Sequence, residues 1–159
     1  MVQWNTSGHD FSRHLSLLVG QSVKAGFVQR QKTWREADGF VGLFRTDEGA
    51  LEASCHLDLP LAAGLGCALS LLSPHAAKEA VESANFSPEL LENIHEIFNV
   101  IGGLKNGPGQ PHVVLAGVFR VLEGADDAPL NWRDLPCEGF IQLNLNLHGS
   151  GAATLRATP

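Results

Sequence analysis

The most regular pattern of apolar and polar positions in the chain lies between Ser87 and Leu104. At about 100° of rotation per residue, one side of this segment is apolar, and its members are Leu90, Ile94, Ile97, Ile101 and Leu104. The opposite side is polar or small and consists of Glu89, Glu92, Glu96, Asn99 and Gly103. Ser87 is a residue type that caps helix N-termini, and Pro88 fits the first helical turn. The pattern predicts a long amphipathic helix with an acidic stripe.

The remaining pattern predicts further helices around this segment, at 10–18, 61–72 and 74–83. Strands are predicted at 22–29, 39–45, 50–57, 112–122, 140–147 and 153–157. The strands at 39–45 and 50–57 flank the turn T-D-E-G and should form a hairpin. Runs of strands between runs of helices indicate an α+β fold with a mostly antiparallel sheet packed against long helices. With no internal repeat and no linker, residues 1–159 should form a single domain.

The composition narrows the classes of protein to which the chain can belong. Of its 159 residues, 44% are apolar and 18% are charged, with a formal net charge of −6. A net negative charge argues against a nucleic-acid partner and against an anionic membrane surface. The longest apolar stretch, 57–72, is interrupted by Asp58 and Pro60 and is too short to span a bilayer. We therefore expect a soluble, cytoplasmic protein with no membrane or nucleic-acid partner.

Common catalytic and metal-binding motifs are absent from the sequence. Three cysteines without a C-x-x-C pair suggest neither a disulfide framework nor a zinc site, so we expect no metal site. His95-Glu96 begins like H-E-x-x-H, but Asn99 stands where that motif needs its second histidine. No G-x-S-x-G occurs, and the glycines at 102–109 lack the ending of a phosphate-binding loop. These observations therefore argue against an enzyme with a nucleophilic side chain and against a metalloenzyme.

Glu96 and Asn99 form the one polar pair that suggests chemistry. They are three positions apart, which places both on one edge of the predicted helix. An asparagine amide can orient a water molecule, and a glutamate can engage a basic residue of a partner. From spacing alone, an ordinary solvated helix face is the favoured interpretation of this pair, and still more so of Glu92 and Gly103 beside it.

The local sequence around this pair resembles a known signature. Residues 96–103 read E-I-F-N-V-I-G-G and fit E-[L/I]-x-N-x-I-x-G. This is similar to the signature helix of the CheC/CheX/FliY family of chemotaxis phosphatases, and the order of predicted elements resembles a CheX-like domain over nearly the whole chain. The resemblance implies that the chain accelerates hydrolysis of the aspartyl phosphate on a CheY-type response regulator. Asn99 would orient the attacking water, and Glu96 would bind a lysine of the regulator.

The resemblance also implies which parts the partner supplies. The phosphorylated regulator would carry the Mg²⁺, so the chain needs no cofactor of its own and no covalent intermediate. Glu92 and Gly103, on the same face, would contact the partner. Double-site family members have a second Glu/Asn pair on an earlier helix, and the predicted helices at 10–18 and 61–72 show none. The chain therefore resembles the single-site CheX type.

Two departures from the family pattern leave a second function open. Glu92 replaces the usual Asp or Ser, and Pro111 comes sooner after the signature helix than expected, so the following loop is shortened or reshaped. The alternative is a non-catalytic CheC/CheX-like module that binds a partner in a chemotaxis, flagellar or other two-component signalling complex.

We also expect a homodimer. The predicted helix at 61–72 has no charged face, so a sheet on one side leaves its other side in need of cover. That cover is either a second subunit or another helix of the same chain, such as 10–18. The resemblance favours the dimer, because single-site CheX-like domains are expected to pair.

Overall fold

The computed structural model describes residues 4, 8–27, 38–122, 125–126 and 132–158. Its helices are α1 (Gly8–Val19), α2 (Leu59–Leu69), α3 (Pro74–Ser83) and α4 (Pro88–Lys105), with a 3₁₀ turn η1 (Trp132–Asp134). Its strands are β1 (Val23–Phe27), β2 (Gly39–Thr46), β3 (Leu51–Asp58), β4 (Val113–Leu122), β5 (Ala125–Asp126), β6 (Cys137–Leu145) and β7 (Gly149–Ala157). Positions 28 and 29 of the first predicted strand lie outside the described residues.

The strands form one sheet in the order β1-β6-β7-β3-β2-β4-β5, and every neighbouring pair is antiparallel. β2 and β3 form the predicted hairpin, in which Gly39 is opposite Asp58 and Leu43 is opposite Ser54. Gly49 closes the turn at φ 89°, a backbone angle that glycine adopts without steric cost. The prediction of an α+β fold with a mostly antiparallel sheet is confirmed.

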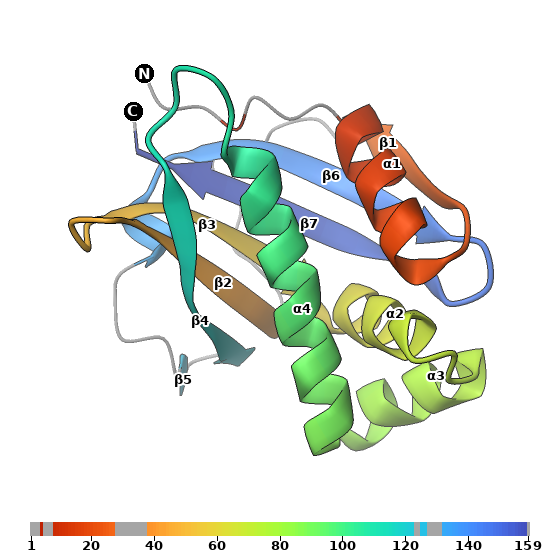
Figure 1. The fold of residues 1–159 in the computed structure, drawn as a ribbon. Coiled ribbons are helices and arrows are strands. Elements are labelled where there is room, and N and C mark those ends of the chain that lie inside the picture. Colours follow the sequence, from red (N-terminus) through yellow and green to blue (C-terminus); the bar gives the residue numbers. More distant parts are fainter. Residues whose placement is uncertain (1–3, 5–7, 28–37, 123–124, 127–131, 159) are drawn as a thin grey trace.

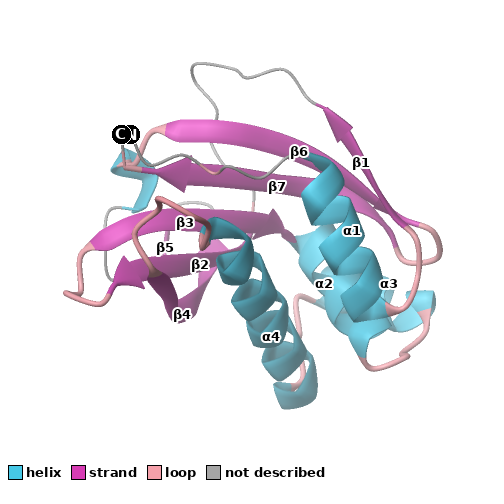
Figure 2. Cartoon of the chain, turned by 45° about the horizontal axis from the view of Figure 1, so that its top comes forward, coloured by secondary structure: helices cyan, strands magenta, loops and turns pink. Residues whose placement is uncertain are grey.

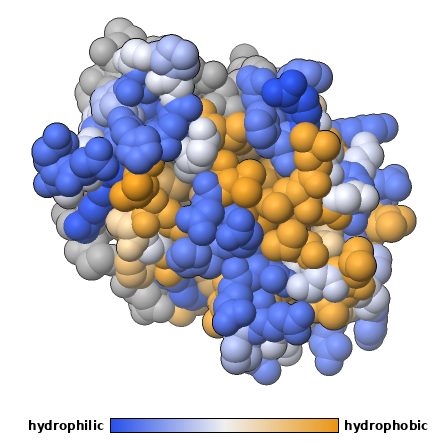
Figure 3. Space-filling view, in the orientation of Figure 1, coloured by the Kyte–Doolittle hydropathy of each residue, from blue (hydrophilic) through white to orange (hydrophobic). Residues whose placement is uncertain are grey.

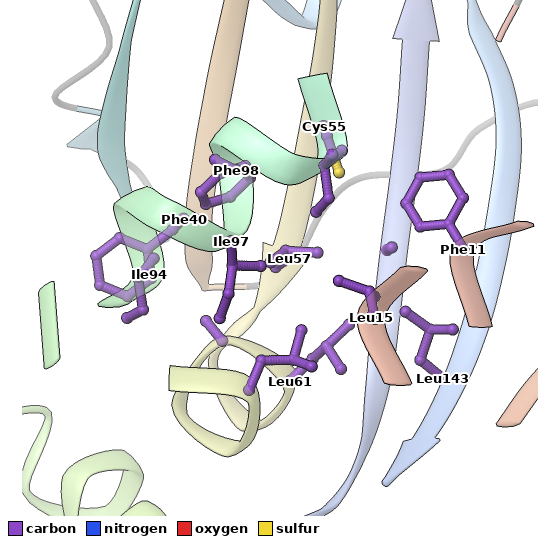
Figure 4. Close-up of a cluster of buried hydrophobic side chains, with 14 of the residues drawn as sticks. Phe11, Leu15, Phe40, Cys55, Leu57, Leu61, Ile94, Ile97, Phe98 and Leu143 are labelled. Carbon is purple, nitrogen blue, oxygen red and sulfur yellow. The ribbon is translucent and has the colours of Figure 1, made fainter. Parts of the chain in front are cut away.

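All four α-helices lie on one face of the sheet (Figures 1 and 2). The main core fills the space between these two layers, where side chains of α4, α1 and α2 meet those of the strands (Figure 4). Ile94, Ile97 and Phe98 come from α4, and Leu61 comes from α2; all four are fully buried. The amphipathic pattern of α4 is thus matched to the sheet below it, as the sequence predicts.

The opposite face of the sheet carries a second, smaller cluster. Val41, Leu43 and Val121 point to this side, and Trp132 of η1 packs on them. The Trp132 ring also stacks on His56 of β3 at 6.0 Å between centroids. The sequence shows residues 123–136 only as a polar excursion, and in the structure its one tryptophan covers the second face.

The helix α2 is covered by its own chain, which corrects the reason given for a homodimer. Residues Leu61 to Ala68 are all buried within the single chain, because α2 lies among α1, α3, α4 and the sheet. Its carboxylate cap is Asp58, whose side chain accepts a hydrogen bond from the Leu61 backbone N–H at 3.0 Å. No face of α2 between these residues requires a second subunit.

Two predicted element ends are also corrected. The helix predicted to reach residue 72 ends at Leu69, and Leu71 follows it at φ 58° with its side chain 91% exposed. The strand predicted to reach 147 ends at Leu145, so Leu147 lies in the β6–β7 turn and is 63% exposed instead of buried. Both leucines continue the apolar pattern of their element, but each lies after the residue at which the helix or strand ends.

Among the described residues, no helix is long and apolar enough to cross a membrane. The cysteines are free thiols, of which Cys55 and Cys67 are buried and Cys137 is partly buried. Burial raises the pKa of the Cys55 thiol well above its ordinary value. Such a thiol is unreactive.

Candidate functional site

The candidate site lies on α4, which is held by an N-terminal cap and by a hydrogen bond to α2. The Ser87 side chain accepts a hydrogen bond from the Leu90 N–H at 3.2 Å, and Pro88 occupies the first turn. Farther along, the Asn93 amide donates to the Gly66 carbonyl of α2 at 3.0 Å. These contacts hold the helix in one position from its first turn onward.

Glu92, Glu96, Asn99 and Gly103 follow one another along the outer face of α4, and all four are exposed. We call these four residues the α4 stripe. Figure 3 shows hydrophilic surface along α4, with hydrophobic surface beside it toward α1. A side chain added at Gly103 would meet no atom within 4 Å, so the stripe ends in open space. The structure thus brings the four predicted site residues together on an accessible surface.

The Asn99 amide contacts two neighbours on the same helix. Its nitrogen Nδ2 lies 3.5 Å from Oε2 of Glu96 and donates to it. The same nitrogen lies 3.4 Å from Nδ1 of His95. Both contacts are long, as hydrogen bonds of catalytic groups often are before a partner or substrate is bound. The amide is therefore held by its nitrogen, and its oxygen is the atom that can act on a ligand.

The inner side of α4 packs closely against β2, and this contact fixes the position of the α4 stripe. A Cβ placed on Gly102 would lie 2.6 Å from the Phe44 ring, and a Cβ on Gly42 would lie 2.5 Å from the Phe98 ring. Phe44 and Phe98 are both fully buried. Glycines at these two positions let the helix sit directly against β2. A polar pair on the outer side is consequently presented from a rigid support.

The loop that follows α4 is tied to β4 by one side chain. The Asn106 amide donates to the Val113 carbonyl at 2.9 Å, and its oxygen accepts from the Val113 N–H at 2.8 Å. This pair of bonds imitates a step of a β-ladder and closes the segment 107–112 into a short loop. Pro111 lies within this loop.

Lys105, at the end of α4, is buried rather than exposed. Its side chain is 2% accessible and lies near the carboxylates of Glu52 and Glu138. Burial lowers the pKa of the Lys105 ammonium, and the two carboxylates partly oppose that shift. This lysine belongs to the support of the helix and not to the stripe.

Sequence reasoning missed three residues around the site: His95, Lys105 and Asn106. His95 carried a usable signal, since residues four apart on a helix are neighbours and His95 precedes Asn99 by four. Asn106 carried a weaker one, as a typical residue for a helix end. The burial of Lys105 depends on Glu52 and Glu138, which come from distant strands and leave no local pattern.

The α4 stripe is an exposed helix face, and it lies outside two pockets of the structure. One pocket of about 380 Å³ is lined by residues that include Trp4, Phe140 and Leu155, and another of about 420 Å³ lies between α3 and the β6–β7 turn. Neither contains a residue of α4. Within the described part of the chain, no group of three or more His, Cys, Asp or Glu residues could hold a metal ion. Small molecules bind in concave sites, so this face suits a protein partner.

No protein-family model matches the chain, and no curated protein matches it. Several solved structures match its fold. The FliM middle domain from H. pylori superposes with a TM-score of 0.65 at 10% identity, over 95% of this chain and 84% of that one. FliY from Thermotoga maritima superposes with a TM-score of 0.64 at 12% identity, over 93% of this chain and 82% of that one. The chain has a CheC/CheX/FliY-like fold.

A FliG–FliM complex from H. pylori provides a further match, with a TM-score of 0.54 at 11% identity over 95% of this chain and 86% of that one. At these identities the likeness establishes the fold and not an activity. The fold expected from E-I-F-N-V-I-G-G is thus confirmed.

Proposed function

We propose that this chain accelerates hydrolysis of the aspartyl phosphate on a CheY-type response regulator. The observation that carries the proposal is the position of Glu96 and Asn99, side by side and exposed on a helix that is held rigidly from below. The proposal makes the chain a hydrolase that acts on another protein in the cytoplasm. It requires no cofactor on this chain, since the regulator would carry the Mg²⁺.

The reaction needs little from this chain beyond orientation. The oxygen of a water molecule attacks the phosphorus, the bond from phosphorus to the aspartyl oxygen breaks, and the aspartate leaves as a carboxylate while inorganic phosphate forms. The Asn99 amide oxygen accepts a hydrogen bond from the attacking water and so directs the water's lone pair toward phosphorus. Positioning of a reactant in this way contributes to rate without a covalent intermediate.

The charge of the α4 stripe supports a basic contact on the partner. Glu92 and Glu96 are exposed, and neither takes part in an ion pair with another described residue. A lysine on the regulator would pair with Glu96 and draw the phosphorylated aspartate toward Asn99. Gly103, which has open space around it, would let the partner backbone approach the helix closely.

The test is a phosphate-release assay with phosphorylated response regulators from the same organism. We expect acceleration by the wild-type chain and its loss in Asn99→Ala and in Glu96→Ala. Glu79→Ala, which removes an exposed acid of α3, is the matched control and should retain full activity. Acceleration that survives both α4 substitutions would overturn the proposed mechanism.

The second candidate is a non-catalytic binding module that uses the same face. It is favoured by the solved structures in which FliM, a protein of this fold, occurs in complexes with FliG and with SpeE. Under this alternative the α4 stripe binds a flagellar or signalling protein. Binding of a phosphorylated regulator without faster phosphate release would support the module and reject the phosphatase.

We retain the homodimer as a proposal that rests on the sequence resemblance alone, since α2 needs no external cover. Leu17, Leu71 and Leu147 are the most exposed large apolar side chains in the described part of the chain. Light scattering at micromolar concentration tests the oligomeric state. A mass near that of one chain, 17.0 kDa, would reject the dimer.

A further inference from the structure

The Asn99 amide has two chemically different ends, and only one of them can orient water as the proposed function requires. The Glu96 carboxylate carries no proton to donate, so the amide end that faces it must be the NH₂ group. The opposite orientation would place the Asn99 oxygen where the nitrogen lies now, 3.5 Å from the carboxylate oxygen Oε2 of Glu96. Two acceptors at that separation repel each other. Glu96 therefore selects which end of the amide points outward.

One contact fixes which end faces inward but leaves the amide free to rock about its last side-chain bond. The ring of His95 supplies a second contact, because Nδ1 lies 3.4 Å from the same Asn99 nitrogen. The two protons of the NH₂ group then have one acceptor each, the Glu96 carboxylate and the His95 ring. With both protons engaged, the plane of the amide is defined, and its oxygen is the end left for a ligand.

We propose that His95 is a positioning residue that, together with Glu96, holds the Asn99 amide with its oxygen toward the attacking water. The inference rests on the proposed phosphatase function. To accept the amide proton, the ring must carry its own proton on Nε2 and not on Nδ1. His95 lies outside the E-x-x-N spacing and precedes Asn99 by one helical turn, so it adds a third member to the pair.

The kinetic test uses substitutions that separate the effect of the hydrogen-bonding nitrogen from the effect of the size of the ring. His95→Ala should lower kcat by about three- to tenfold, the effect of one modest hydrogen bond, and leave KM for the regulator unchanged. His95→Asn should restore most of the rate, because the asparagine oxygen can take the place of Nδ1. His95→Gln should not, because its oxygen lies one bond farther out. His75→Ala, an exposed histidine of α3, is the control.

A second readout does not depend on activity. In nuclear magnetic resonance spectra of the wild-type chain, the Asn99 side-chain NH₂ group should be more ordered than in His95→Ala, and His95→Asn should restore that order. An Asn99 signal unchanged in His95→Ala would overturn the inference, as would a kcat that stays at the wild-type value. If no phosphate release is seen even with the wild-type chain, the proposed function fails, while the amide signal still decides the role of His95.

Discussion

Two adjacent glycines of α4 offer a quantitative test of how this helix is seated. Gly102 faces the sheet and is buried, whereas Gly103 belongs to the α4 stripe and is exposed. A Cβ on Gly102 would lie 2.6 Å from Cε1 and 3.0 Å from Cδ1 of the buried Phe44 ring. A Cβ on Gly103 would meet nothing within 4 Å. The same substitution by alanine therefore has opposite consequences at neighbouring positions.

The expected magnitudes follow from these distances. Within a helix, alanine is more favourable than glycine by up to about 1 kcal/mol, and Gly103→Ala should gain most of this. Gly102→Ala gains the same propensity but forces the Phe44 ring or the helix to move, which costs roughly 1–3 kcal/mol in a packed core. The free energy of unfolding of Gly102→Ala should thus fall below that of Gly103→Ala by about 1–3 kcal/mol.

Urea unfolding and thermal unfolding of the two variants measure this difference directly. For a chain of this size, about 1 kcal/mol corresponds to a shift in Tm of roughly 2–4 °C. Gly103→Ala should raise Tm slightly, and Gly102→Ala should lower it relative to Gly103→Ala. Equal stability of the two variants would show that α4 does not pack on β2 through Gly102. In the phosphatase assay, the stable Gly103→Ala variant should still bind its partner less well, because the methyl group stands in the stripe.

Other predictions concern the support of the site. Asn106→Ala should lower the free energy of unfolding by about 1–3 kcal/mol, because the buried ends of the Val113 peptide lose both partners, and hydrogen exchange should rise in 107–112. Burial raises the pKa of Asp58 above its ordinary 3.8, so the folded state binds this proton more tightly than the unfolded state. Relative to Asp58→Asn, the free energy of unfolding of the wild-type chain should therefore fall as the pH rises through the window just above 3.8. The opposite slope in urea unfolding would contradict this. The pKa of Lys105 is lowered from its ordinary 10.5, so the folded state holds this proton less tightly than the unfolded state. The free energy of unfolding of the wild-type chain should therefore rise relative to that of Lys105→Met as the pH approaches 10.5 from below. Parallel pH profiles of the two proteins would refute this prediction.

The helix that carries the site was predictable because its signals are local. Ser87 and Pro88 mark its start, and the apolar spacing marks its inner face. The same periodicity placed Glu96 and Asn99 together on the outer face, where the structure has them. Phe98 was not on the predicted apolar arc. It is buried because Gly42, on a strand far away in the sequence, leaves room for its ring.

What the sequence could not predict depends on contacts between distant segments. An uncharged helix at 61–72 has to be covered, but its sequence does not say by what, and the cover proved to be three helices and the sheet of the same chain. Trp132 lies in a polar segment and nevertheless completes the second face of the sheet. Leu147 extends an alternating pattern past the end of its strand, since the pattern reports a side of the strand and not the residue where the strand ends.

The exposure of the α4 stripe also separates its function from the stability of the fold. Glu96 and Asn99 are exposed, and their described side-chain contacts are confined to α4. Exposed substitutions of this kind usually change the free energy of unfolding by no more than about 0.5 kcal/mol, and alanine is at least as good a helix former as either residue.

Glu96→Ala and Asn99→Ala should therefore unfold within about 2 °C of the wild-type chain while phosphate release is lost. A drop in Tm well beyond this range in either variant would mean that the pair supports the helix, and a loss of activity could then no longer be attributed to the chemistry of the amide and the carboxylate. Phe98→Ala provides the contrast, because a buried ring removed from the seat of α4 should cost roughly 3–5 kcal/mol and abolish activity only through the fold.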